Sequence, residues 1–464
     1  MTMTYQQAQV AAREHLLLHF TQHESVFRGG GELLVLERGE GPYVFDSRGR
    51  RYIDALSSLF CSQLGYSYGE EMAAAVNNQL TTLAFNTNWG TAHPAAIELA
   101  AALAERAPGD LNHVFFTSGG SEAVEAAWKI AREHFVAQGQ PQRTKAIARD
   151  RAYHGVTLGA LSFTGLAPMK EAFGAPAVEV HRVSNTNAFR ATDGDDQAFA
   201  KRLLAEVRAT IQAAGPDEVA MIIAEPVQNS GGCLTPPPGY WRGLRAIADE
   251  YGILLVADSV ICGFGRLGNW LGIEQEGVVP DLVTTAKGIT SAYAPMGAVF
   301  VGSAVAESLH QPGVTLRHGI TFGGHPVAAA VALKNIEIIE RDQILAHVRA
   351  TETHLAARMD ELRALPIVGD VRGAGFFHCV ELVKDGVAAR FDQAERDRLI
   401  RGFLSARLRE AGLIARADDR GDSVVQIAPP LICERDVLDT IVDRLGEVLT
   451  DAAAHMGLDV PVTA

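Results

Sequence analysis

Lys287 is the residue of this sequence with the clearest potential for covalent chemistry. It lies in the stretch TTAKGITSAYAPMG and is the only charged side chain between Asp281 and Glu307. Its small and apolar neighbours are typical of a protein interior, where an unpaired ammonium group is costly. A lysine that is removed from water loses its proton more readily and becomes a nucleophile that can form Schiff bases. The alternative is a lysine that reaches the surface from a loop.

Asp258 is a second position with potential for chemistry. It ends the otherwise apolar run ILLVAD, 29 residues before Lys287. Because a carboxylate in such a run is costly without a cation or strong hydrogen-bond donors, we expect Asp258 to have a partner in the interior. A purely structural aspartate is the alternative.

The segment FFTSGGSEAVEAAWKIAREH predicts an anion site. Strand-like residues run through TSGGS (117–121) directly into a helical pattern. The free amides at the start of a helix attract anions, and two glycines let a phosphate approach the backbone closely. The alternative is an ordinary helix start, with Ser121 as the capping residue and Glu122 in the first turn.

Together these three features predict a site for pyridoxal phosphate. Ligands of a covered parallel sheet gather at the carboxyl ends of its strands, and each feature follows a strand-like run. The helix start suits the phosphate, Asp258 suits the protonated pyridine nitrogen, and Lys287 suits the aldehyde. A single cofactor would therefore explain all three costly features.

The elements that must position these residues alternate between strands and helices over residues 61–325. Continuous apolar strands between helices indicate a mostly parallel sheet that is covered on both faces, and thus an α/β fold. The strand-like runs are at 113–116, 145–148, 219–224, 253–257 and 297–302, with helical patterns at 121–138 and 239–250.

Residues 326–464 follow a different pattern, which predicts a smaller α+β domain. Helices are expected at 326–341, 393–411 and 434–455, with short strands in VRGAGFFHCVEL and SVVQIAPPL. Residues 1–60, which include two short strands within 43–54, are expected to join this small domain. The predicted large domain, which binds the cofactor, covers residues 61–325.

Composition excludes several classes of protein. Of 464 residues, 41 are Lys or Arg and 55 are Asp or Glu, and the net charge of -14 disfavours nucleic acid and anionic membranes as partners. No apolar run is long enough to span a bilayer, and the N-terminus lacks the features of a secretory signal, so we expect a cytoplasmic protein. Five cysteines without a CxxC pair indicate neither a disulfide framework nor a zinc site, and no metal is expected.

Over nearly its whole length the chain resembles the class III pyridoxal-phosphate aminotransferases of the fold-type I group. Blocks such as YIDALSSLF, AYHGVTLGALSFTG, IIAEPVQNSGG, LLVADSVICGFGRLG, TTAKGITSAYAPMGAVF and HGITFGGHPVAAAVALKNIEI occur in the order and approximate spacing of that family. The resemblance implies a mostly parallel, seven-stranded central sheet covered by helices, and pyridoxal 5'-phosphate as cofactor.

The resemblance also implies roles for individual residues. Lys287 matches the Schiff-base lysine, Asp258 the carboxylate on the pyridine nitrogen, and Glu225 an acidic residue that lines the site. Tyr153 and Val260 match the residues on the two faces of the cofactor ring. The other implied cofactor contacts are Ser118, Gly119, Gly120, Ser121, His154, Gly155, Thr321 and Phe322.

Thr321, in the TFGGHP block, matches a threonine that reaches the phosphate in the neighbouring subunit. The resemblance thus implies a homodimer with shared active sites, and a tetramer remains open. Ser259 stands where the family usually has Glu, and we expect its side chain to point away from the ring. Ser230 stands where enzymes for omega-amino acids often have a Glu that masks an arginine, which favours the amine:pyruvate branch.

The block LIARADDRGDSVVQIAPPLI matches the region that contributes a mobile, carboxylate-binding arginine in that branch. Both Arg416 and Arg420 qualify, and Arg416 fits the block better. A guanidinium group would hold a substrate carboxylate with two hydrogen bonds and swing away for an uncharged amine. The alternative is a surface arginine paired with Asp418 or Asp419. Leu59, Phe60 and Trp89 would line the substrate pocket, unless they belong to the core.

The function that these features predict is a ping-pong transfer of an amino group from a primary amine or omega-amino compound to pyruvate or another keto acid. One alternative is an aminotransferase for omega-amino acids such as 4-aminobutyrate or ornithine, with 2-oxoglutarate as acceptor. A decarboxylating transaminase, an aminomutase and a non-catalytic protein that binds pyridoxal phosphate are further alternatives. The sequence does not identify the amine donor.

Overall fold

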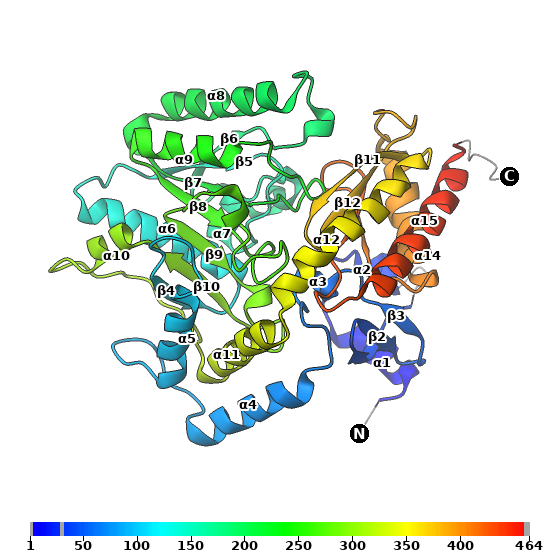
Figure 1. Cartoon of the computed structure of the whole chain (residues 1–464), viewed down its shortest axis with the longest axis horizontal. Helices are drawn as coiled ribbons and strands as arrows, with labels where there is room; N and C mark the ends of the chain where they lie inside the picture. Colours follow the sequence, from blue (N-terminus) through cyan, green and yellow to red (C-terminus); the bar gives the residue numbers. More distant parts are fainter. Residues whose placement is uncertain (1–2, 28–31, 459–464) are drawn as a thin grey trace.

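A seven-stranded sheet forms the centre of the left half of the molecule in Figure 1, within the described residues 3–27 and 32–458 of the computed structural model. The strand order is β4-β10-β9-β8-β7-β5-β6, and β10 runs antiparallel to both of its neighbours. The other pairs that involve β5 to β9 are parallel, which confirms the predicted mostly parallel sheet. The strands are β4 (His113–Thr117), β5 (Lys145–Arg149), β6 (Glu179–Val183), β7 (Val219–Ala224), β8 (Leu254–Asp258), β9 (Leu282–Thr285) and β10 (Gly297–Val301).

Helices cover both faces of this sheet because its strands are apolar on both sides. Every residue of β7, β8 and β10 is buried. One apolar cluster joins the sheet to helices α6 (Gly120–Ala137), α7 (Leu158–Phe163) and α10 (Ser303–Leu309). A second cluster joins the other face to α5 (Pro94–Ala104), α8 (Asp196–Ala214), α9 (Tyr240–Tyr251) and α11 (Pro326–Arg341).

The right half of Figure 1 contains a smaller, antiparallel sheet with the order β11-β12-β14-β13. Helices α12 and α15 pack on it through a separate apolar core. The strands are β11 (Val368–Ala374), β12 (Phe377–Leu382), β13 (Arg416–Asp418) and β14 (Val424–Ile427), and the two helices are α12 (Ile344–Asp360) and α15 (Arg435–Met456).

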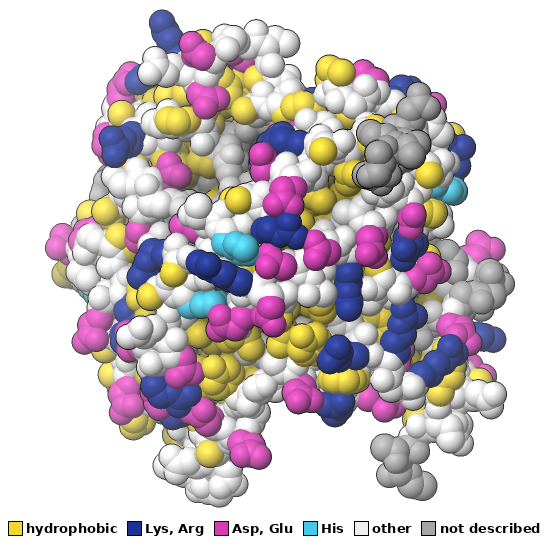
Figure 2. Space-filling view, turned by 45° about the vertical axis from the view of Figure 1, so that its right-hand side comes forward, with side chains coloured by type: hydrophobic (Ala, Val, Ile, Leu, Met, Phe, Trp, Pro, Cys, Tyr) yellow, Lys and Arg dark blue, Asp and Glu magenta, His cyan; other side chains and the backbone are white. Residues whose placement is uncertain are grey.

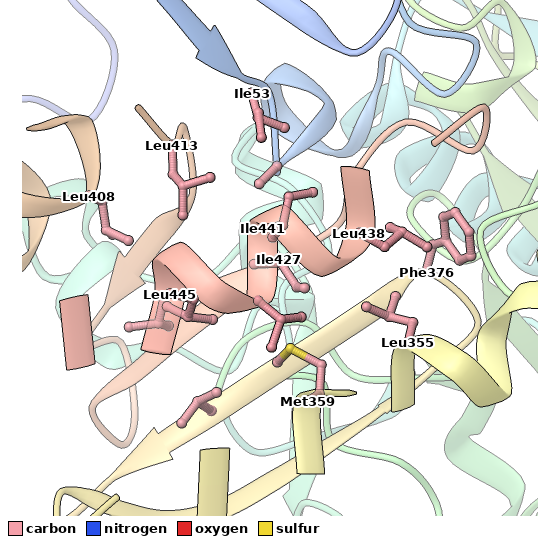
Figure 3. Packing of buried hydrophobic residues seen from close by; sticks show 14 of the residues in the cluster. Ile53, Leu355, Met359, Phe376, Leu408, Leu413, Ile427, Leu438, Ile441 and Leu445 are labelled. Atoms are coloured by element: carbon pink, nitrogen blue, oxygen red, sulfur yellow. The ribbon is translucent and has the colours of Figure 1, made fainter. Parts of the chain in front are cut away.

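The N-terminal segment completes this smaller core. Ile53 points into the cluster formed by Leu413, Ile427 and Ile441 (Figure 3). The backbone amide of Ile53 donates to the carbonyl of Gly412 at 2.9 Å. The segment contains α1 (Tyr5–His15), α2 (His23–Phe27), a sheet of β1 (Leu36–Glu40), β2 (Tyr43–Asp46) and β3 (Arg51–Ile53), and α3 (Ser57–Phe60), and is followed by α4 (Gly69–Thr82).

Helix α11 belongs to both cores. Ala329 and Ala332 pack in the cluster of the large sheet, whereas Ile338 and Ile339 pack in the smaller core. The helix therefore links the two halves mechanically. The division of the chain at residues 60/61 and 325/326 stays a prediction.

The single helix expected over residues 393–411 is wrong in its middle part. The structure has α13 (Gln393–Arg396), then a π-helix over Asp397–Leu404, and then α14 (Ser405–Glu410). Leu399 and Leu404 are both buried and lie five residues apart, which is the spacing that i→i+5 hydrogen bonds align on one face.

On the face drawn in Figure 2, basic side chains are interspersed with acidic ones and form no continuous basic patch. Across residues 3–27 and 32–458, we find no helix that is both long and apolar enough to cross a membrane. The same residues contain no group of His, Cys, Asp and Glu side chains placed to hold a metal ion. The five cysteines, all in the described part of the chain, are free thiols.

Candidate active site

The junction between β4 and α6 forms a cradle for an anion. Gly119 precedes the helix in extended conformation, and no side chain caps the helix start. Ser121 does not cap the helix, because its hydroxyl accepts the amide of Val156 at 3.1 Å instead. The first amides of α6 lack intrahelical acceptors and are available to a ligand.

Close packing around this cradle requires glycine at two positions. A Cβ atom at Gly120 would lie 3.0 Å from Val260, which joins the cradle to the segment after β8. Gly155 has a φ of +111°, and a Cβ atom there would lie 2.4 Å from the Ser121 hydroxyl. Side chains of any size would therefore push the helix start away from the loop that carries Tyr153.

Asp258 ends β8 and is held by three donors although it is only 4% exposed. Its Oδ2 lies 2.7 Å from Nδ1 of His154, and its Oδ1 accepts the Thr284 hydroxyl at 3.0 Å. The amide of Val260 donates to Oδ1 at 3.2 Å. These contacts fix the carboxylate in one orientation at the end of its strand. Asp258 thus has the interior partners that its sequence context predicts.

Glu225 follows β7 and also lies in the interior. Its two oxygens accept the backbone amides of Tyr153 at 3.3 Å and Asn229 at 2.9 Å. Burial raises the pKa of Glu225, and the nearby charge of Asp258 raises it as well, whereas His154 and Arg149 act in the opposite direction. Glu225 therefore anchors the loop that carries Tyr153 beside the cavity.

Lys287 lies just after β9, at the same edge of the sheet as Asp258. Its neighbours Ala286 and Gly288 are buried, as expected of an interior stretch, and Lys287 itself is half-buried and lines a cavity. Its amine has no hydrogen bond or ion pair to any residue that the structure describes, and its φ of +48° is unusual for a residue with a side chain.

The three predicted features surround one cavity of about 130 Å³. The lining residues are Gly120, Ser121, Tyr153, His154, Gly155, Glu225, Asp258, Val260, Ile261 and Lys287. These residues fit pyridoxal phosphate, since they combine a helix start without a cap, a carboxylate fixed by hydrogen bonds and an unpaired amine. Ser118 and Gly119 do not line the cavity; the amide of Ser118 donates to Glu122 at 2.7 Å.

Arg416 and Arg420 lie beside Tyr153 at the edge of this cavity. The guanidinium carbon of Arg420 is 5.7 Å from the centre of the Tyr153 ring. Burial raises the pKa of Tyr153, and the positive charges of both arginines partly offset this increase. Both guanidinium groups also contact Asp418. Asp419, the other suggested partner, pairs with Arg401 at 3.1 Å.

The three residues predicted to line the substrate pocket have different environments in the structure. Phe60 is 1% exposed and packs against Phe377 with 5.6 Å between ring centres, which fits the alternative of a core residue. Leu59 and Trp89 are 53% and 63% exposed. Neither of these two lines the cavity in the isolated subunit.

Thr321 and Phe322 are also exposed and lie outside the cavity lining. Phe322 is 59% exposed and packs edge-on against Phe85, with 5.6 Å between ring centres. Thr321 therefore does not contact the cradle of its own subunit.

Sequence reasoning missed two positions around the site. Thr284, the second residue before Ala286, donates to Asp258, and Ile261 lines the cavity. Pairing of an arginine with Asp418 was an expected alternative, and the structure shows that Asp418 contacts both arginines. The two threonines that end the short strand β9 were a signal for Thr284, whereas nothing in the sequence marked Ile261.

Ser259 and Ser230 are buried, and the hydroxyl of each has no hydrogen-bond partner among the described protein atoms. Ser259 is absent from the cavity lining. This agrees with a side chain that points away from the cofactor site.

The family model for class III aminotransferases matches residues 27–449. The chain belongs to the class III aminotransferases. Among relatives, a probable aminotransferase of Mycobacterium tuberculosis is 48% identical over 439 residues, which are 94% of this chain and 93% of that protein. The putrescine–pyruvate aminotransferase of Pseudomonas aeruginosa is 37% identical over 453 residues, which are 96% of each protein.

A solved structure of similar shape is the (S)-enantioselective omega-transaminase from Thermomicrobium roseum. Its TM-score is 0.93 at 39% identity, and the match covers 97% of this chain and 100% of that chain. These similarities confirm the fold-type I architecture. As a class III aminotransferase, the protein is a transferase that depends on pyridoxal phosphate.

Proposed function

We propose that this aminotransferase moves an amino group from a primary amine or omega-amino compound to pyruvate, or to another keto acid, by a ping-pong mechanism. The supporting observation is that the amine of Lys287, the carboxylate of Asp258 and the uncapped start of α6 surround one cavity. Family membership sets aside the alternative of a non-catalytic binding protein.

In this proposal the cofactor is held at three points. The amides of Gly120 and Ser121 bind the phosphate, Asp258 binds the pyridine nitrogen, and Lys287 binds the aldehyde. When bound, pyridoxal phosphate supplies an electron sink that stabilises negative charge on the reacting substrate carbon. His154 and Thr284 keep Asp258 in the orientation that this contact needs.

Lys287 has a second task once the substrate amine has replaced it. Its free Nζ takes the proton from the substrate carbon that bears the nitrogen. The absence of an ion pair supports this task, because the amine has no competing carboxylate in the described chain. Tyr153 and Val260 both line the cavity, and we assign them to the two faces of the cofactor ring; Glu225 keeps the backbone of Tyr153 in place.

Pyruvate is the acceptor that we favour. Ser230 in place of a masking Glu, the arginines beside Tyr153 and the similarity to an enzyme named putrescine–pyruvate aminotransferase support it. We assign the carboxylate contact to Arg416. Its side chain is 24% exposed and has a single contact to Asp418, at 3.2 Å, whereas Arg420 is held by several bonds.

We also propose a homodimer with shared active sites. The exposed apolar side chains of Trp89, Phe85 and Phe322 form a surface that a second copy would cover, and Thr321 beside them would reach the cradle of that copy. The sharing is tested by mixing Lys287→Ala with Thr321→Ala subunits. If the mixture is more active than either variant alone, the result would support shared active sites. The cytoplasmic location and the tetramer stay predictions.

The function is tested by screening donors with the purified holoenzyme. Monoamines, diamines and omega-amino acids are each supplied with pyruvate, and alanine formation is followed together with the visible absorbance of the cofactor. We expect alanine to form only with donors that also bleach the resting absorbance. Carbon dioxide release or isomerisation of a single substrate would instead indicate the decarboxylating or aminomutase alternatives.

The alternative acceptor is tested in the same screen. Omega-amino acids such as 4-aminobutyrate are paired with 2-oxoglutarate, and glutamate is measured. A higher rate for this pair than for every amine with pyruvate would replace our proposal. No absorbance change with any primary amine would refute it altogether.

A further inference from the structure

Two positive charges and one negative charge lie together at β13 and the residues after it. Arg416 and Asp418 are two residues apart in β13, so their side chains share one face of the strand, and Arg420, in the bend that follows, binds Asp418 through its own side chain. All three are largely shielded from solvent, with side-chain exposures of 24% for Arg416, 6% for Asp418 and 23% for Arg420. The three groups form a compact charged cluster, which we call the β13 triad.

Asp418 binds both guanidinium groups of the triad. Nε of Arg420 donates to both carboxylate oxygens at 3.0 Å, and Nη2 donates to Oδ2 at 2.6 Å. Nε of Arg416 lies 3.2 Å from the same Oδ2. One carboxylate is thus shared unequally, with a strong contact to Arg420 and a weaker contact to Arg416.

The triad adjoins the cavity through Tyr153. Tyr153 is one of the residues that line the cavity, and the guanidinium carbon of Arg420 lies 5.7 Å from the centre of its ring. The charges of Arg416 and Arg420 both act on the Tyr153 hydroxyl, so both groups lie within electrostatic range of the cavity edge. A substrate carboxylate that approaches Tyr153 would meet these two guanidinium groups.

The charges of the triad sum to +1, because Asp418 is ionised. Burial raises the pKa of Asp418, but the hydrogen bonds from Arg420 and the charge of Arg416 hold it below its ordinary value. A substrate with one carboxylate would therefore neutralise the triad. A substrate with two carboxylates would bring one negative charge in excess into a poorly solvated site, which is unfavourable.

We propose that Asp418 is a specificity-determining residue that competes with substrate carboxylates for Arg416 and Arg420, and thereby restricts the acceptor to keto acids with a single carboxylate. The inference rests on the proposed transfer to a keto acid and adds the reason for acceptor choice. Asp418 also gives Arg416 a partner while an uncharged amine occupies the cavity, so that no guanidinium group remains unpaired there.

The variant Asp418→Asn tests this role, since it removes the competing charge at nearly constant volume. The measurement is the half-reaction of the holoenzyme in its aminated form with pyruvate or with 2-oxoglutarate, followed by cofactor absorbance. We expect the ratio of kcat/KM for 2-oxoglutarate to kcat/KM for pyruvate to rise about tenfold. The wild type is expected to prefer pyruvate clearly.

Asp419→Asn is the matched control. It removes the same charge one residue away, where the carboxylate pairs with Arg401 instead of the triad. We expect the acceptor ratio of this variant to equal that of the wild type. An equal change in Asp418→Asn and Asp419→Asn would overturn the inference, because a general charge effect would then explain both.

A second variant keeps the inference testable if Asp418→Asn does not fold. Arg420→Gln leaves Arg416 and Asp418 as a neutral pair, so KM for pyruvate should rise about tenfold. An unchanged KM would overturn the inference. A wild type that accepts 2-oxoglutarate as well as pyruvate would also overturn it while leaving the aminotransferase function intact. A wild type that reacts with no keto acid would refute the proposed function, and the inference with it.

Discussion

The two ends of the cavity are built in different ways. At the cofactor end, Asp258 ends one central strand and Glu225 follows another; each is 4% exposed and is fixed by hydrogen bonds to neighbouring loops. At the substrate end, Arg416 belongs to β13, a three-residue edge strand, Arg420 lies in the bend after it, and both are about a quarter exposed. The residues assigned to the chemistry are thus held in one orientation by the sheet, whereas those assigned to substrate choice are side chains that can exchange partners.

Removal of the Lys287 amine should have the largest effect on activity at the cofactor end. Lys287→Ala should lower turnover about 10⁴-fold, since it removes the general base and the covalent anchor together. Circular dichroism should show an unchanged fold, because the side chain makes no hydrogen bond or ion pair with the described residues. Lys201→Ala in α8, an exposed position, is the control and should keep full activity. Near-normal turnover of Lys287→Ala would contradict the assignment.

Asp258→Asn should have the next largest effect. Loss of the negative charge weakens the contact to the protonated pyridine nitrogen, and we expect kcat to fall about 10² to 10³-fold. The amide can still accept the Thr284 hydroxyl, so the melting temperature should change little. Cofactor content and kcat are measured together. A decrease below threefold at full cofactor content would argue against this role.

Gly155→Ala tests the rigidity of the same end. The new Cβ atom would meet Ser121, and the positive φ adds backbone strain, so we expect a loss of about 1 to 3 kcal/mol in unfolding free energy and weaker cofactor binding. Gly174→Ala is the control, because Gly174 has a similar positive φ of +79° but nothing within 4 Å. If both variants retain the cofactor equally, close packing at the cradle is unimportant.

Glu225→Gln should have the smallest effect, and one that depends on pH. A carboxyl group whose pKa is raised on folding stabilises the protein at low pH and loses that contribution as pH rises through the raised pKa. Wild type should therefore lose stability relative to Glu225→Gln as pH rises above 4.5, the ordinary pKa of a glutamate. Melting temperatures of both proteins on either side of this pH measure it. A parallel pH dependence would show that Glu225 does not titrate in this way.

The cofactor end could be predicted from the sequence because its residues stand at fixed places after strands. Each of these residues differs from what its neighbours predict. Lys287 and Asp258 are charged residues in stretches typical of the interior, and Gly120 is a glycine at the start of a helical pattern. The strand β9 escaped notice because it is only four residues long and ends in two threonines, and β6 because it contains His181 and Arg182. Local patterns therefore suffice where the chemistry follows a strand end.

The substrate end could not be predicted in the same way. Phe60 and Leu59 are adjacent and both apolar, yet the irregular backbone of α3 sends one into the core and leaves the other exposed. The sequence shows two aspartates next to Arg420, but only the three-dimensional arrangement decides that Asp418 binds the arginines and Asp419 does not. Partner choice among neighbouring charges depends on side-chain direction, which short patterns leave open.

The junction between Ile53 and Gly412 has a consequence for biosynthesis. The side chain of Arg50 donates to the carbonyl of Arg409, 359 residues later in the chain, and Ile53 fills part of the core formed by the C-terminal helices. The N-terminal segment thus leaves the ribosome long before the C-terminal residues that it packs against have been synthesised. We expect the large sheet to form first, since the strands of the N-terminal segment can complete their core only after the C-terminal residues have been synthesised. Contacts between such distant residues form slowly, and the apolar surface of the segment stays accessible to chaperones until then.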